Sequence, residues 1–199
     1  MNSAPVNYSN VLQIKQSGKG IPYGGSGAVR EDGGTNYGFK NLKGSPERIA
    51  EIPELEGDEA LRNLVMSLNR PGSAFATVGC VSGRIDEQQG FRVSGYVEFA
   101  FDSADAVTDA ASYFPLFFHF DRALHMMKFS DHVHFHWELM GATFLMAKMA
   151  GFTVTITVNT GWYPSANEAS IAWANGLGFL ADYFVQVPPV QGAQLFNVV

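Results

Sequence analysis

Hydrophobic and polar positions alternate most regularly in residues 152–159, FTVTITVN. This period of two predicts a half-buried β-strand. A different pattern follows Asp58, where apolar residues recur at the i, i+3, i+4, i+7 spacing of one helical face: Leu61, Leu64, Val65 and Leu68. Such spacing predicts an amphipathic helix packed on other elements. The chain therefore combines α and β structure.

Further elements follow from composition and capping residues. Ser45 and Pro46 predict the start of a helix, and two runs rich in β-branched and aromatic residues, 73–83 and 90–101, predict a β-hairpin. A short helix is expected from Ser103 to Tyr113. The apolar runs 114–120 and 122–129 are predicted to be buried, but they show no clear period.

The last third is predicted to run helix, strand, helix, strand. The composition predicts a helix from Gly141 to Ala150, before the strand at Phe152. A capping box of Ser165 and Glu168 predicts a helix from Ala166 to Asn175. Gly176 and Gly178 are expected to end this helix, and a final strand is expected near Phe179 to Val187.

Residues 1–44 differ in composition from the rest of the chain. Nine glycines lie within residues 17–44, which indicates too much backbone entropy for an independent core. The glycine spacing matches neither common phosphate-binding pattern. We therefore expect a glycine-rich extended arm over 1–44 that binds a protein partner, and a globular domain over 45–199.

Composition and charge narrow the function classes. The net charge is −6, and no cluster of Lys and Arg is present, which argues against nucleic acid as a partner. The apolar runs are too short to cross a bilayer, and the N-terminus lacks the pattern of a signal peptide. The single cysteine, Cys80, suits a reducing compartment. These features predict a protein that is cytoplasmic or assembled in a virus particle, with no membrane partner.

The stretch HVHFHWE, residues 132–138, gathers three of the five histidines. On a strand, period-two alternation places His132, His134, His136 and Glu138 on one face, whereas on a helix they scatter. One hypothesis is a metal site formed by His132, His134 and Glu138, since H-x-H followed by Glu resembles the first metal motif of cupins. The glycines that flank that motif are absent, and the other interpretation is a solvated strand face without metal.

The C-terminal third resembles the GNAT-type N-acetyltransferases. The similarity covers about residues 131–187 and is carried by KMAGFTVTITV and by NEASIAWANGLGF, in which Asn167 opens a helix and Gly178-Phe179 begins a strand. The resemblance implies an α/β (α+β) fold with a mixed, mostly antiparallel sheet flanked by helices. It also implies acetyl-CoA as cofactor and, by family position, Asn167 as a cofactor-binding residue.

The sequence lacks two features on which catalysis by this family depends, the cofactor-binding loop and a catalytic tyrosine. The cofactor loop should lie near residues 131–136, DHVHFH, where the glycines that would admit a pyrophosphate are missing. Ala174 stands where many members carry a catalytic tyrosine. We therefore expect no catalytic residues and no cofactor, with acetyl-CoA as the alternative.

These observations favour a non-catalytic, GNAT-like binding or structural component of a larger assembly or oligomer, with a phage or virus particle as one setting. Two alternatives remain. The first is an active acetyl-CoA-dependent N-acetyltransferase with an unorthodox cofactor loop, and the second is a His-rich metal-binding protein.

Overall fold

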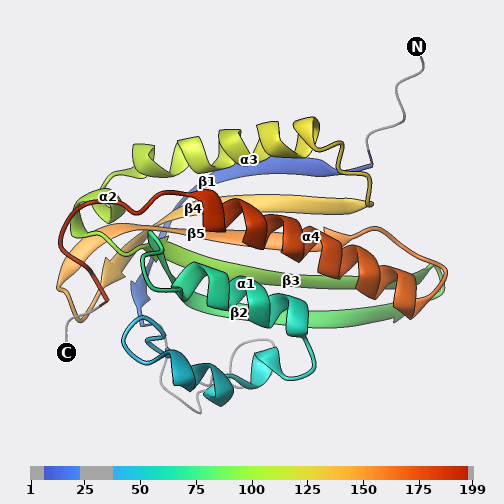
Figure 1. Cartoon of the computed structure of the whole chain (residues 1–199), viewed down its shortest axis with the longest axis horizontal. Coiled ribbons are helices and arrows are strands. Elements are labelled where there is room, and N and C mark those ends of the chain that lie inside the picture. The colour runs from blue at the N-terminus through green and yellow to red at the C-terminus, as the bar shows by residue number, and fades with distance from the viewer. Residues whose placement is uncertain (1–6, 23–37, 197–199) are drawn as a thin grey trace.

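A computed structural model of the chain describes residues 7–22 and 38–196. Figure 1 shows two layers, in which helices α1, α3 and α4 lie side by side across one face of a five-stranded sheet. The strand order is β1-β4-β5-β3-β2. Every neighbouring pair is antiparallel except β1 and β4, which are parallel. The expected α+β fold with a mixed, mostly antiparallel sheet flanked by helices is confirmed.

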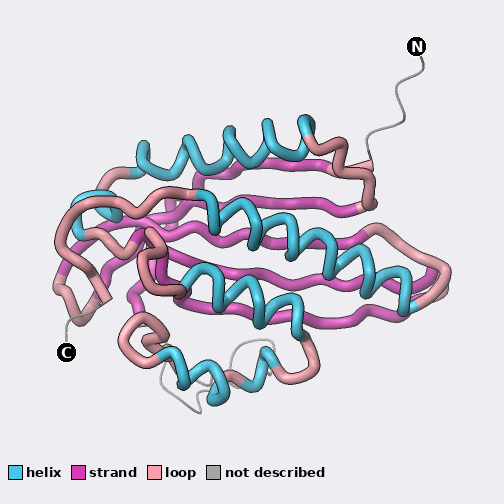
Figure 2. The backbone as a smooth tube through the Cα atoms, in the orientation of Figure 1, coloured by secondary structure: helices cyan, strands magenta, loops and turns pink. Residues whose placement is uncertain are grey.

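Figure 2 shows the helices and strands along the backbone. The strands are β1 (Ser9–Ile21), β2 (Phe75–Glu87), β3 (Gly90–Phe101), β4 (Val133–Phe144) and β5 (Met149–Thr160). The α-helices are α1 (Glu59–Asn69), α2 (Ala104–Thr108), α3 (Phe114–Met126) and α4 (Ala166–Gln186). Three short 3-10 helices are η1 (Pro46–Glu51), η2 (Pro53–Leu55) and η3 (Ala110–Tyr113).

Several sequence predictions are confirmed. The side-chain carboxylate of Asp58 caps α1 by accepting a hydrogen bond from the Leu61 N–H, and the four apolar residues predicted to share one face of this helix are all buried. The β2-β3 hairpin and strand β5 form as expected. Ser165 caps α4 by accepting a hydrogen bond from the Glu168 N–H, at 3.2 Å.

The helix predicted from Gly141 to Ala150 is wrong, because these residues form the end of β4, a tight turn and the start of β5. The two strands pair as an antiparallel hairpin up to Phe144 and Met149. Lys148, in the turn, has a φ of 51°, which a helix does not allow. Cross-strand pairing outweighs the weak helical preference of this segment, since propensity is readily overridden by tertiary context.

The strand predicted near Phe179 to Val187 is also wrong, because α4 continues to Gln186. Gly176 does not end the helix but lies against the sheet, where an added Cβ would be 3.2 Å from Cγ1 of Val133. Leu177, Leu180 and Phe184 continue the buried face of α4 at helical spacing. The glycine therefore allows close packing of α4 on β4 instead of a helix stop.

The arm predicted over 1–44 is corrected over Ser9–Ile21, which forms strand β1 of the sheet. The sheet thus includes residues before position 45. Residues 1–6, 23–37 and 197–199 lie outside the described residues. Strand β1 pairs with β4, which lies about 120 residues further along the chain. The glycine-rich composition of residues 17–44 gave no local signal that the segment before them would pair with so distant a strand.

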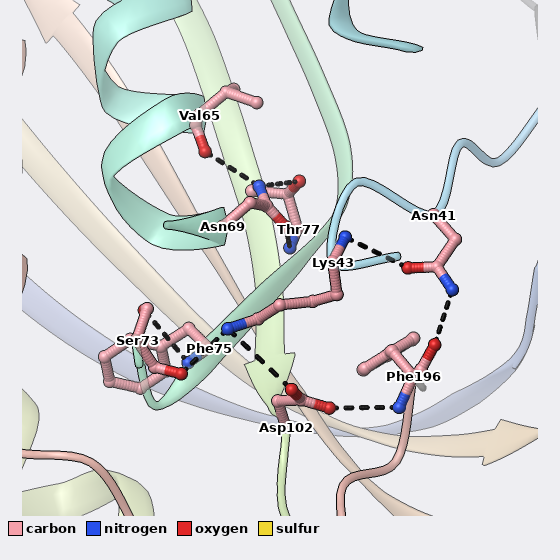
Figure 3. Close-up of polar contacts among 9 residues, drawn as sticks. All are labelled: Asn41, Lys43, Val65, Asn69, Ser73, Phe75, Thr77, Asp102 and Phe196. Carbon is pink, nitrogen blue, oxygen red and sulfur yellow. Dashed lines mark hydrogen bonds and ion pairs between the residues drawn. The ribbon is translucent and has the colours of Figure 1, made fainter. Parts of the chain in front are cut away.

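A buried ion pair and its hydrogen bonds join four segments of the chain near the end of β3, as Figure 3 shows. Lys43 Nζ lies 3.7 Å from Asp102 Oδ2, and their side chains are 6% and 2% exposed. Lys43 also donates a hydrogen bond to the Ser73 carbonyl, and Asp102 Oδ1 accepts one from the Phe196 N–H. These contacts fix the segment before η1 and the C-terminal segment against the sheet.

Candidate functional site

Strand β4 contains the stretch HVHFHWE except for His132, which directly precedes it, so of the two geometries that the sequence left open the structure has the strand. Its side chains alternate: Val133, Phe135 and Trp137 are buried, whereas His134 and His136 are partly exposed on the opposite face. On this second face, His134 lies beside Asn159 of β5. The alternation follows from the period of two that any strand imposes on its side chains.

The proposed metal ligands do not converge. The rings of His132 and His134 meet edge to face, with centroids 5.0 Å apart. Glu138, in contrast, lies four strand residues from His134, a separation of about 13 Å at the rise of a strand. Its Oε1 forms an ion pair of 2.5 Å with Lys15. Among the described residues, no group of three or more His, Cys, Asp and Glu side chains could hold a metal ion.

His134 is engaged with the neighbouring strand. Its Nδ1 lies 2.8 Å from the hydroxyl oxygen of Ser9 on β1. Burial, and to a lesser extent the neighbouring His132, hold the pKa of His134 below its ordinary value. The side chain therefore favours the neutral imidazole and helps to hold β1 on β4.

The residues that the family resemblance assigned to a cofactor occupy different positions. Residues 131–136 lead into β4 instead of forming a loop before a helix, and the N–H groups of this strand lie between β1 and β5. Asn167 is exposed in the first turn of α4, and Gly178 and Phe179 lie inside that helix. The two chain junctions that carried the resemblance are thus absent from the described structure.

A hollow beside the end of β1 has a volume of about 540 Å³ and is lined by these residues: Gly18, Lys19, Gly20, Thr108, Gly141, Ala142, Thr143, Ala150, Gly151 and Phe152. Lys19 is the one ionisable side chain among them. Its Nζ forms an ion pair of 2.5 Å with Oε2 of the buried Glu98. The other lining residues are glycine, alanine, threonine and phenylalanine.

The strongest candidate for a functional surface is the side of the molecule where β1 meets α3. Large apolar side chains are more than half exposed there: Val11 (52%) and Ile14 (61%) on β1, Phe118 (61%) and Met126 (68%) on α3, and Met127 (72%) directly after it. We call these five residues the β1–α3 edge. Ile14 lies on the helical face of the sheet, whereas Val11, an odd number of residues away on the same strand, lies on the opposite face with Ser9 and Lys15. Exposed apolar side chains close together on a surface are typical of interaction sites.

Contacts between β1 and α3 hold this edge together. Asn10 donates a hydrogen bond of 3.2 Å to Asp121 of α3, and the ring of Tyr8, which directly precedes β1, meets His125 edge to face with the ring centroids 5.6 Å apart. Phe118 is three residues before Asp121 and seven before His125, which places all three on one face of α3. Phe118 therefore lies on the side of α3 that follows β1.

Sequence reasoning missed this surface because it assigned Val11 and Ile14 to an arm. The one available signal was the short apolar run VLQI, residues 11–14, within an otherwise polar and glycine-rich region. That signal is too short to show a strand without its partner.

Comparisons with known proteins add no family assignment. No family model, no curated protein and no solved structure matches the chain. Among the described residues, the helices are too short or too polar to cross a membrane.

Proposed function

We propose that the chain is a non-catalytic binding or structural component of a larger assembly and that it contacts a protein partner through the β1–α3 edge. The observation that carries this proposal is the exposure of five large apolar side chains along an edge strand and its neighbouring helix. A phage or virus particle is one setting in which such a component would serve.

An edge strand also offers its backbone to a partner. Strand β1 ends the strand order, so its outer edge has no strand partner among the described residues. Unpaired N–H and C=O groups along such an edge can pair with a further strand, while neighbouring apolar side chains are covered at the same time. Backbone pairing and apolar burial together would supply a specific contact.

The acetyl-CoA alternative has less support from the geometry. A pyrophosphate site of this kind needs free N–H groups at a helix N-terminus, close to glycines. The stretch expected to provide them instead leads into β4, which lies between two other strands, β1 and β5. Its backbone groups are used in the sheet, which favours the binding role.

Two measurements test this proposal. Isothermal titration calorimetry of the full chain with acetyl-CoA and with Zn²⁺ should show no binding at micromolar concentrations. Complexes isolated from cells that produce the tagged chain should be larger than the chain itself, and Ile14→Lys should reduce them. Ile171→Lys is the matched control, because Ile171 is 51% exposed on α4, away from β1. Binding of acetyl-CoA at micromolar concentrations would contradict the proposal, and so would an amount of complex that Ile14→Lys leaves unchanged.

A further inference from the structure

The outer edge of β1 lacks the features that normally prevent strands from pairing between molecules. Residues 9–14, SNVLQI, contain no charged residue and no proline. The opposite edge of the sheet, β2, carries Arg84, Asp86 and Glu87 near its end. Charges on an edge strand hinder association, and they protect the end of β2. The first half of β2 is uncharged as well, but its apolar side chains are buried or half-buried, whereas Val11 and Ile14 on the first half of β1 are exposed. Among the described residues, the first half of β1 is therefore the edge better suited to a partner strand.

We propose that the partner of this edge is a second copy of the chain, whose β1 pairs antiparallel with the first so that the two sheets become continuous. This inference rests on the proposed function and names the partner. Self-pairing is electrostatically permitted because the paired stretch is nearly uncharged. A single strand edge that pairs with itself about a two-fold axis gives a closed dimer.

The geometry of the strand restricts the register. A two-fold axis perpendicular to the sheet keeps each side chain on its own face of the sheet. Two residues that pair across the axis must therefore point to the same face, so they are an even number of positions apart in the sequence. An axis at Leu12 satisfies this rule and pairs the whole stretch Ser9–Lys15, which precedes the register shift between Lys15 and Gly18. Val11 would then lie opposite Gln13 of the partner subunit, and no like charges would lie opposite each other.

The same axis brings the helices together. Figure 1 shows α3 running along β1 on the helical face of the sheet. Rotation about an axis perpendicular to the sheet places the second α3 on that same face, next to the first across the joined strands. Ile14 and Phe118, each 61% exposed in the single chain, would become covered. One arrangement therefore covers an exposed apolar residue of β1 and one of α3, while Val11, on the opposite face of the sheet, would lie beside Gln13 of the partner subunit.

Sedimentation velocity of the full chain over a range of concentrations tests the dimer. We expect a concentration-dependent dimer, with the dissociation constant raised at least about tenfold by Ile14→Lys, because a charge would be buried at the contact. Ile171→Lys, at a similarly exposed site on α4, should leave the dimer unchanged. Circular dichroism melting confirms that each variant is folded.

Cysteine pairing tests the register. In chains that also carry Cys80→Ala, Val11→Cys and Gln13→Cys are prepared separately, then mixed and oxidised. The mixture should form a disulfide heterodimer, whereas Val11→Cys alone should form far less, because each residue 11 faces residue 13 and not its own copy. Both positions are exposed, so neither substitution disturbs the core.

The outcomes separate this inference from the proposed function. A dimer that Ile14→Lys weakens and that gives the mixed disulfide supports the inference. A monomer at every concentration, or a dimer unaffected by Ile14→Lys, overturns it. If cell-derived complexes still depend on Ile14 in that case, the proposed function stands with a different protein as the partner; if they do not, both fail.

Discussion

The indole Nε1 of Trp173 on α4 donates a hydrogen bond of 2.9 Å to Oδ2 of Asp58, 115 residues earlier in the chain. The same oxygen accepts a hydrogen bond from the Ser82 hydroxyl of β2 at 2.7 Å, while Oδ1 caps α1 through the Leu61 N–H. One carboxylate thus joins two helices and a strand. An added Cβ at Gly95 would lie 2.8 Å from the Trp173 ring, so the glycine makes room for the indole against the sheet.

Asp58→Ala should therefore cost at least about 2 kcal/mol of unfolding free energy, because it removes a helix cap and leaves two donors without their acceptor. Trp173→Phe should cost less, since the cap remains. Urea unfolding of the two single variants and the double variant measures their coupling, which we expect at about 0.5 to 3 kcal/mol. Additive effects would show that the bond contributes nothing to stability.

The buried pair of Lys43 and Asp102 gives a second prediction. Lys43→Met should destabilise the chain by about 3 to 5 kcal/mol, because Asp102 would remain buried without its cation. The double variant Lys43→Met, Asp102→Leu should recover much of this loss. Lys40→Met is a suitable control, since Lys40 pairs with the half-exposed Glu51 and such pairs contribute under about 1 kcal/mol. Equal losses from the two lysines would contradict the prediction.

His134 should make stability depend on pH. Its pKa in the folded chain is lowered by burial and by His132, so the unfolded chain binds more protons between that pKa and the ordinary value. The stabilising contribution is complete above a pH of about 6.5 and is lost as the pH falls through the folded pKa. Unfolding measured from pH 5 to 7.5 should show a shallower slope in His134→Gln.

Cys80 should be unreactive in the native chain. Burial, with smaller contributions from Glu54 and Asp58, raises the pKa of its thiol to about 12. At pH 8 only about one thiol in ten thousand would then be the reactive thiolate. Ellman's reagent should react slowly with the folded chain and rapidly in denaturant. Rapid, stoichiometric labelling of the folded chain would show that the thiol is accessible and activated.

The sequence by itself determined the elements whose signals are local. Asp58 and the apolar residues after it specify α1 because a helix joins residues three and four apart, and the alternation of residues 152–159 specifies β5. For HVHFHWE the sequence left a strand and a helix open, and only the structure decided for the strand and so for the side chains that share a face of β4. The separation of His134 from Glu138 has a local cause, since residues along one face of a strand lie about 6.6 Å further apart with each second residue.

Only the tertiary structure decided the elements whose partners are distant. Residues 141–150 become a hairpin because β4 and β5 pair, and α4 passes through Gly176 because Val133 packs against that position. Strand β1 exists because β4 offers an unpaired edge about 120 residues away. Backbone hydrogen bonds between strands do not depend strongly on side-chain identity, so a glycine-rich stretch can form a strand although its sequence shows no strand pattern. For the same reason, the exposed edge formed by β1 and α3 could be seen only after both elements were placed side by side.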